Sequence, residues 1–168
     1  MNKDALRQRE DLFLAEGVRL AGDAEIRLGE EVNIWYNAVL RATGHPITIG
    51  DRTNIQDGTV IHTSGHAGVT IGRDVTVGHC ALIHGCTIGD ETLIGMGSTV
   101  MNDAKIGSHV IIGAGSLVTE RTEIPDGMLA FGRPAKVIRP LTEEEMDGLK
   151  HQAADYVKEA EKEKTRCR

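Results

Sequence analysis

Aliphatic residues recur every six positions along most of the chain, a period that suits neither an amphipathic α-helix nor an alternating β-strand. From Ile94 to Ile124 this step repeats without a slip. Such a period is the signature of a hexapeptide repeat and predicts an all-β solenoid, a parallel β-helix. Three hexads make one triangular coil, so the aliphatic residues form three inward-facing columns: Leu28/Ile49/Ile71/Ile88/Ile106, Ile34/Ile55/Val77/Ile94/Ile112 and Leu40/Ile61/Ile83/Val100/Val118.

The same register predicts the corners, loops and limits of the solenoid. A glycine follows every member of the first column, where we expect tight corners with unusual backbone dihedral angles: Gly29, Gly50, Gly72, Gly89 and Gly107. The register slips at 43–48 and 63–70, where loops should protrude. Residues 1–19 show no clear period. We therefore predict a β-helix domain over 1–140, with its clearest repeats over 28–130.

A helix is predicted after the coil. The Gly-Arg-Pro-Ala stretch at 132–135 should end the coil, and Thr142 to Glu145 form a capping box that opens a helix. Apolar residues then recur at helical spacing: Met146, Leu149, Ala153, Val157 and Ala160. We expect a helix over 141–164 that packs on the coil or on a neighbouring subunit, followed by a frayed tail over 165–168.

Composition narrows the class of partners. The 168 residues suffice for one domain, and a formal net charge of −6 argues against nucleic acid as the main partner. No apolar run is long enough to span a membrane, and Met1–Asp4 has no apolar signal region. Cys80, Cys86 and Cys167 lack the spacing of a disulfide framework. We expect reduced thiols in a cytoplasmic protein, with Cys80 and Cys86 small and buried.

Three histidines lie inside the regular part of the repeat. His62 and His84 follow equivalent aliphatic residues in adjacent coils, so they share one column about 4.8 Å apart. Arg41 falls one coil below His62 in that column. His79 occupies another corner of the triangle, and its own chain does not easily bring it to the pair. A threefold axis would do so, which predicts a metal site shared between the subunits of a trimer.

Three neutral imidazoles with a fourth position open to water are typical of catalytic zinc. Such an ion lowers the pKa of its bound water to about 7. Imidazole also suits iron and cobalt, so Fe²⁺ or Co²⁺ are alternatives to Zn²⁺. The simpler alternative is three ordinary surface or corner histidines.

Several stretches resemble the gamma-class carbonic anhydrases. They are Thr53–Gly58, Ile61–His62, Val77–His79, Ile83–Gly89, Ile94–Gly97 and Gly132–Lys136. The resemblance runs from about residue 12 to the C-terminal helix. It implies a left-handed β-helix and a homotrimer with three interfacial metal ions. Each ion would be bound by His62 and His84 of one subunit and by His79 of another.

The resemblance also assigns roles around the metal. Gln56 would orient a metal-bound hydroxide, with Asn54 positioning Gln56, and Asp57 would lie at the interface beside the metal ligands. Arg41 would hold the interface and contact the anion, and Tyr156 would lie near the metal. The ordinary alternatives are corner capping for Asn54 and Asp57, a surface salt bridge for Arg41 and helix packing for Tyr156.

Two features depart from the family pattern. Thr43 stands where the family commonly has an aspartate, so the expected acidic partner of Arg41 is missing. The loop Thr63–Gly68 lacks the acidic residues that pass protons to solvent in the best-known members. His66 is the alternative proton carrier, because an exposed imidazole titrates near neutral pH; an ordinary loop histidine is the simpler interpretation.

The expected activity is that of a zinc-dependent lyase, a carbonate dehydratase that hydrates carbon dioxide to bicarbonate through a metal-bound hydroxide. Two alternatives use the same scaffold. One is a thioesterase that hydrolyses an acyl-CoA, and the other is a catalytically weak, trimeric metal-binding structural protein.

Overall fold

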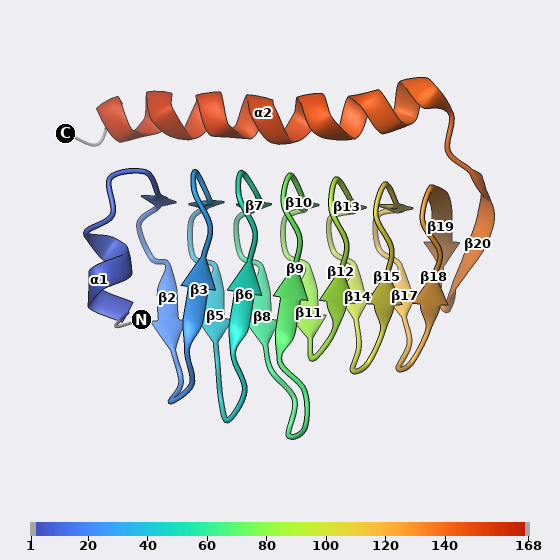
Figure 1. Ribbon diagram of the computed structural model, residues 1–168, viewed down its shortest axis with the longest axis horizontal. Coiled ribbons are helices and arrows are strands. Elements are labelled where there is room, and N and C mark those ends of the chain that lie inside the picture. The colour runs from blue at the N-terminus through green and yellow to red at the C-terminus, as the bar shows by residue number, and fades with distance from the viewer. Residues whose placement is uncertain (1–2, 167–168) are drawn as a thin grey trace.

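The computed structural model describes residues 3–166 and forms a left-handed parallel β-helix with one long helix along its side (Figure 1). Met1, Asn2, Cys167 and Arg168 lie outside the described residues, so the prediction for Cys167 is not tested here. The predicted solenoid of hexapeptide repeats with a C-terminal α-helix is confirmed.

Three sheets form the sides of the triangular coil. Sheet A contains β1 (Phe13–Leu14), β4 (Asn33–Ile34), β7 (Asn54–Ile55), β10 (Thr76–Val77), β13 (Leu93–Ile94), β16 (Ile111–Ile112), β19 (Met128–Gly132) and β20 (Ala135–Pro140). Sheet B contains β2 (Arg19–Ala21), β5 (Val39–Arg41), β8 (Val60–His62), β11 (Leu82–His84), β14 (Thr99–Val100) and β17 (Leu117–Val118). Sheet C contains β3 (Ile26–Leu28), β6 (Ile47–Ile49), β9 (Val69–Ile71), β12 (Thr87–Ile88), β15 (Lys105–Ile106) and β18 (Glu123–Ile124).

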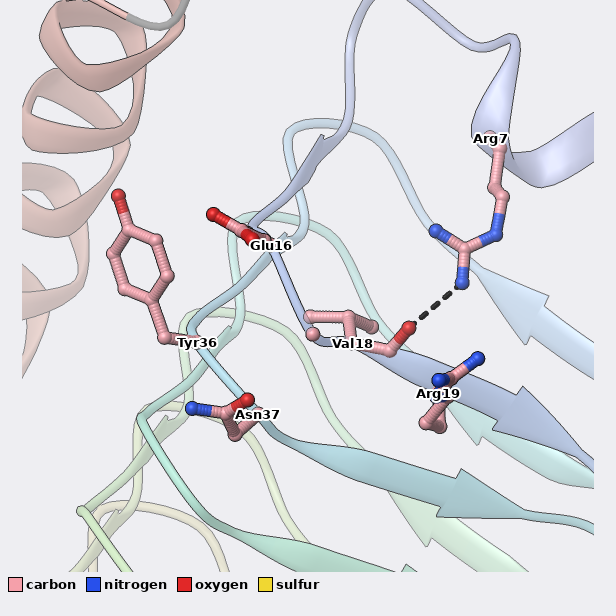
Figure 2. Close-up of a pocket in the computed structure, with 7 residues that line it drawn as sticks. Arg7, Glu16, Val18, Arg19, Tyr36 and Asn37 are labelled. Atoms are coloured by element: carbon pink, nitrogen blue, oxygen red, sulfur yellow. Dashed lines mark hydrogen bonds between the residues drawn. The ribbon is translucent and has the colours of Figure 1, made fainter.

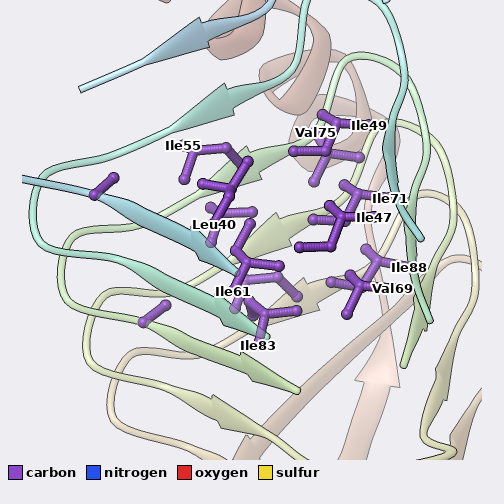
Figure 3. Close-up of a cluster of buried hydrophobic side chains, with 14 of the residues drawn as sticks. Leu40, Ile47, Ile49, Ile55, Ile61, Val69, Ile71, Val75, Ile83 and Ile88 are labelled. Carbon is purple, nitrogen blue, oxygen red and sulfur yellow. The ribbon is translucent and has the colours of Figure 1, made fainter. Parts of the chain in front are cut away.

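The three aliphatic columns predicted from the sequence are confirmed by the strand register. Ile61, for example, is paired with Leu40 in the coil before and with Ile83 in the coil after. These side chains point into the coil and are completely buried (Figure 3). Burying one such side chain contributes about 1.5–3 kcal/mol, and because the covering atoms come from adjacent coils, stacking stabilises the fold.

The coil begins earlier than the visible period. Leu14 in β1 pairs with Ile34, and Leu20 in β2 pairs with Leu40, so both belong to the columns. The eight-residue step from Leu20 to Leu28 hides this first coil from a search for a six-residue period. Helix α1 (Lys3–Arg7) precedes it and lies at the N-terminal end of the stack (Figure 1).

The glycines after the first column are needed for a reason other than the predicted one. None of the five has a positive φ; the left-handed residues of this corner lie two positions later, at Glu31, Arg52, Asp74, Glu91 and His109. A Cβ atom on Gly50 would instead lie 2.6 Å from the backbone nitrogen of Arg73 in the next coil. Glycine is required because successive coils approach closely, not because the corner needs unusual dihedral angles.

A hairpin and a helix follow the last coil. Strands β19 and β20 pair antiparallel and extend sheet A. Helix α2 (Glu143–Arg166) then runs back along sheet A, contacting β1, β4, β7 and β10 (Figure 1). The capping box is confirmed, because Thr142 Oγ1 accepts from the Glu145 amide at 3.2 Å and Glu145 Oε2 accepts from the Thr142 amide at 2.9 Å. Within residues 3–166 neither helix is long and apolar enough to cross a membrane.

Candidate metal centre

His62 and His84 meet because β8 and β11 are in register. The two residues are direct partners in the ladder of sheet B, and both lie at the ends of their strands. His62 Nδ1 is 3.0 Å from His84 Nε2, and the ring centroids are 4.9 Å apart with the planes at 68°. The predicted stacking is confirmed. Bonds of about 2.0–2.1 Å, the usual zinc–nitrogen length, would let one ion reach both nitrogens.

His62 has a hydrogen-bonding capacity that the described chain does not satisfy. Its Nε2 atom is buried and has no hydrogen-bond partner among the described residues. Burial lowers the pKa of His62, and the nearby Arg41 and His84 lower it further. The imidazole is therefore held toward its neutral form, the form in which histidine binds a metal. A neutral ring fits a metal ligand: Nδ1, which faces His84, is the nitrogen that would bind, and Nε2 would then keep the ring proton.

Arg41 lies beside the pair, as the register predicts. It is the ladder partner of His62, and its Nη2 is 3.5 Å from His62 Nδ1. Arg41 forms no ion pair within the described part of the chain. The loop after it is held by two side chains: Thr63 Oγ1 donates to the Thr43 carbonyl and accepts from the Thr43 amide, and Asp23 Oδ1 accepts from the Gly44 amide, all at 2.9 Å.

His79 lies at the corner between sheets A and B and is paired with Asp57. The Asp57 Oδ2 atom, one coil below, is 2.9 Å from His79 Nδ1. A carboxylate in this place fixes the tautomer with the proton on Nδ1, which leaves Nε2 to bind a metal. The His79 side chain is 44% exposed, so it is accessible to another subunit.

Gln56 and Asn54 form a buried hydrogen-bonded chain beneath His79. Gln56 Nε2 donates to Asn54 Oδ1 at 3.1 Å, and Gln56 Oε1 accepts from the His79 backbone amide at 3.2 Å. Asn54 in turn donates to Thr76 Oγ1 at 2.8 Å. Gln56 is thus held in one orientation next to His79, and the Gln56–Asn54 contact is the one the resemblance implied.

Tyr156 belongs to helix α2 and lies on the face of that helix turned toward sheet A. Its ring packs edge-on against Trp35, with centroids 5.7 Å apart and planes at 80°. Burial raises the pKa of Tyr156, and Glu159 and Asp57 raise it further. Helix packing, one of the two interpretations of this residue, is confirmed; its proximity to a metal stays a prediction.

The two described cysteines differ. Cys86 is buried, and burial raises its pKa to about 12, which confirms the prediction for this thiol. The prediction that Cys80 is buried is wrong. Cys80 is exposed because it occupies the left-handed position of the corner beside His79, with φ at 57°, where the side chain faces outward.

The three histidines do not come together within one chain. Among residues 3–166 no three histidine, cysteine, aspartate or glutamate side chains form a group that could hold a metal. His79 lies in the turn that precedes β11, whereas His84 is the last residue of that strand, so the two histidines lie at opposite ends of one side of the coil. A site with all three imidazoles therefore needs a second chain.

Sequence reasoning missed one neighbour of the pair. Asn102 Oδ1 is 2.5 Å from His84 Nδ1. The available signal was its position, because it lies two residues after Val100, which stacks on Ile83 immediately before His84.

A separate cavity lies beside the first coils and is not part of this centre. It has a volume of about 640 Å³, and Arg7 donates across it to the Val18 carbonyl at 2.7 Å (Figure 2). Its lining contains no histidine: it consists of Arg7, Glu16, Gly17, Val18, Arg19, Tyr36 and Asn37.

The known proteins that are similar to this chain carry two kinds of name, carbonic anhydrase and hexapeptide transferase. Residues 85–120 match the family model described as bacterial transferase hexapeptide (six repeats). Two solved structures share the fold closely. The BC4754 gene product of Bacillus cereus is 41% identical, with a TM-score of 0.89 over 94% of this chain and 90% of that one. A hexapeptide transferase family protein from Anaplasma phagocytophilum is 37% identical, with a TM-score of 0.83 over 91% and 89%.

Curated relatives match along nearly the whole chain. Carbonic anhydrase of Geobacillus kaustophilus is 42% identical over 149 residues, covering 89% of this chain and 81% of the relative. Protein YrdA of Escherichia coli is 44% identical over 168 residues, covering 92% and 91%. Gamma carbonic anhydrase 2, mitochondrial, of Arabidopsis thaliana is 42% identical over 154 residues, and the chain spans only 55% of its length. From these relatives and the hexapeptide solenoid, the chain belongs to the gamma-class carbonic anhydrase family.

Proposed function

We propose that this protein is a metal-dependent carbonic anhydrase that hydrates carbon dioxide to bicarbonate at a site between the subunits of a homotrimer. The observation that carries the proposal is the convergence of His62 and His84, whose ring nitrogens are 3.0 Å apart. The two histidines supply part of a ligand set that one chain does not complete. Zn²⁺ is the expected ion, with Fe²⁺ or Co²⁺ as alternatives.

The position of sheet B supports the trimer. His79 lies just before the N-terminal end of β11 in this sheet, and His62 and His84 lie at the C-terminal ends of β8 and β11. A threefold axis facing sheet B would bring the His79 corner of each subunit against the His62/His84 corner of the next. Val60 and Leu82 are adjacent on the outer face between these corners and are 37% and 39% exposed. Exposed aliphatic neighbours at this place favour a surface that another subunit covers.

The chain's own residues prepare the site for neutral-pH chemistry. A divalent ion bound there would supply hydroxide from water near pH 7 by lowering the pKa of that water. His62 is kept toward its neutral form by burial, and Asp57 orients His79 through Nδ1. Gln56, fixed by Asn54 and by the His79 amide, keeps a second amide hydrogen to orient an oxygen nucleophile.

Arg41 and His66 are assigned the ionic steps of the reaction. The Arg41 guanidinium has no carboxylate partner among the described residues, so it is available to attract the bicarbonate anion. His66 in the loop after His62 is exposed, and its Nε2 lies 2.9 Å from Asp103 Oδ2. An exposed imidazole beside a carboxylate is suited to carry protons to buffer.

A second candidate is an enzyme that acts on acyl-CoA, such as a thioesterase. The family model and the Anaplasma phagocytophilum structure are named for hexapeptide transferases, so chemistry other than carbon dioxide hydration occurs in the names of proteins similar to this chain. A non-catalytic metal-binding trimer is a third candidate, since Arg41 lacks the acidic partner common in the family.

The test is stopped-flow carbon dioxide hydration on protein whose metal content has been measured. We expect saturable hydration with about one metal per subunit, and loss of hydration in His79→Ala by a factor of at least ~100. His151→Ala, which removes an exposed histidine of α2, is the matched control and should keep the activity. Full metal content without hydration above buffer would contradict the proposal and direct the search to acyl-CoA substrates.

A further inference from the structure

The side chain of Asn102 determines which nitrogen of His84 is free. We propose that Asn102, itself held by Glu120, is a positioning residue that locks His84 in the tautomer with its proton on Nδ1. Nε2 is then left with the lone pair that a metal needs. The inference rests on the proposed metal-dependent function and names two residues that neither the resemblance nor the comparisons assign.

The first support is a short contact. His84 Nδ1 and Asn102 Oδ1 are 2.5 Å apart, close enough that a proton must lie between them. The amide oxygen of asparagine only accepts hydrogen bonds. The proton therefore belongs to His84 Nδ1, provided that the amide is oriented with its oxygen toward the ring.

Glu120 sets that orientation. The Asn102 Nδ2 group donates to Glu120 Oε1 at 3.4 Å. Turning the amide over would place its oxygen against the carboxylate and its NH₂ group against the ring, so an acceptor would face an acceptor. The carboxylate of Glu120 thus selects the amide orientation that presents Oδ1 to His84.

The backbone leaves room for this contact at Gly85. A Cβ atom at Gly85 would lie 3.0 Å from Asn102 Oδ1 and 2.9 Å from Ser64 Cβ, and Gly85 has a φ of 53°. Glycine here permits both the left-handed turn and the approach of the amide. Asn102 is therefore seated against the turn that directly follows His84.

The tautomer of His84 determines which of its nitrogens can bind a metal beside His62. With its proton on Nδ1, His84 has the Nε2 lone pair facing His62 Nδ1 at 3.0 Å. Asp57 acts in the same way on His79, through Nδ1 at 2.9 Å. Two of the three proposed ligands thus have their Nδ1 proton held by a side chain of an adjacent coil, one by a carboxylate and one by a neutral amide.

The first experiment reads the tautomer in the metal-free protein by ¹H–¹⁵N correlation of the histidine rings at pH 8. His84 of the wild type should be in the Nδ1–H tautomer, and Asn102→Asp, which keeps the acceptor, should preserve it. Asn102→Leu should shift His84 to a mixture in which Nε2–H appears. An unchanged His84 tautomer in Asn102→Leu overturns the proposal. This readout needs no turnover, so a protein that hydrates no carbon dioxide leaves it intact.

The second experiment measures Zn²⁺ affinity by competition with a chelator. Asn102→Leu should weaken binding by about 10- to 100-fold, the usual effect of losing such a partner, while Asn102→Asp should bind more tightly than Asn102→Leu because it keeps an acceptor toward His84. Glu120→Ala, which removes the acceptor for the Asn102 amide group, should weaken binding, whereas Glu123→Ala, an exposed control on β18, should not. Equal affinities for the wild type, Asn102→Leu and Glu120→Ala overturn the proposal, as does binding by Asn102→Asp that is no tighter than that of Asn102→Leu.

Discussion

Asp57 and His79 stand one above the other in adjacent coils, with Asp57 Oδ2 2.9 Å from His79 Nδ1. Both side chains are more than two-fifths exposed, so the hydrogen bond between them contributes less than about 1 kcal/mol to folding. The pair is therefore better explained by the orientation of a ligand than by stability.

The Asp57→Ala variant tests this interpretation. Zn²⁺ affinity should fall by about 10- to 100-fold, because the His79 ring loses the group that fixes its tautomer. The free energy of unfolding of the metal-free protein should change by less than about 1 kcal/mol. Chelator competition and urea unfolding measure the two quantities. A large loss of stability with unchanged affinity would show that Asp57 is a structural residue.

The outer face of sheet B should hold the subunits together. Leu82→Lys places a charge at the centre of this face, opposite Val60, and should convert trimers to folded monomers with reduced metal content. Ile138→Lys, at a 57% exposed position on β20, is the control and should remain trimeric. Sedimentation velocity gives the state of assembly. Trimers in Leu82→Lys would show that another face forms the contact.

The close approach of the coils predicts a cost for adding a single methyl group at Gly50. Its Cβ would lie 2.6 Å from backbone atoms of Gly72 and Arg73, which cannot move without disturbing the next coil. Gly50→Ala should lower the free energy of unfolding by about 1–3 kcal/mol, as overpacking usually does. Gly65→Ala, where nothing lies within 4 Å of the new atom, should have little effect in the same urea titration.

The buried Cys86 thiol should make the fold sensitive to alkaline pH. Burial raises its pKa from 9.0 to about 12, so between these values the folded chain keeps a proton that the unfolded chain loses. The stabilisation is complete below pH 9 and is lost as the pH rises toward 12, with a slope of up to about 1.4 kcal/mol per pH unit. Urea unfolding between pH 8.5 and 10.5 should show a weaker pH dependence in Cys86→Ala; equal slopes would exclude the thiol as the cause.

Much of the fold is readable from the sequence because the period itself encodes the contacts. Residues six apart face inward, and residues one coil apart stack, so the pairing of Ile61 with Ile83 follows from counting. The first coil was not predicted, because the eight-residue step after Leu20 interrupts the six-residue period. The reason why glycine is required at position 50 was not predicted, because it depends on the distance between coils, and a sequence period carries no information about that distance.

In the site, as in the fold, the contacts set by the register could be predicted from the sequence and the others could not. The contact of His62 with His84 follows from the register, since both residues end equivalent strands. Asn102 could not be selected by residue type, because its role depends on a corner side chain that reaches back to the preceding coil. The proposed place of His79 beside the pair requires a second subunit, which no contact within one chain specifies.

The central claim, that each site is shared between subunits, is tested most directly by mixing two inactive variants. His79→Ala and His84→Ala each lack a ligand, so homotrimers of either should have no complete site. In a cyclic trimer every mixed assembly contains one complete site, and random association of equal amounts should therefore restore about a quarter of the wild-type metal sites and hydration rate. The variants should be unfolded and refolded together, with each refolded alone as the control. Recovery near that level is the predicted result, and no recovery from demonstrated mixed trimers would contradict a shared site.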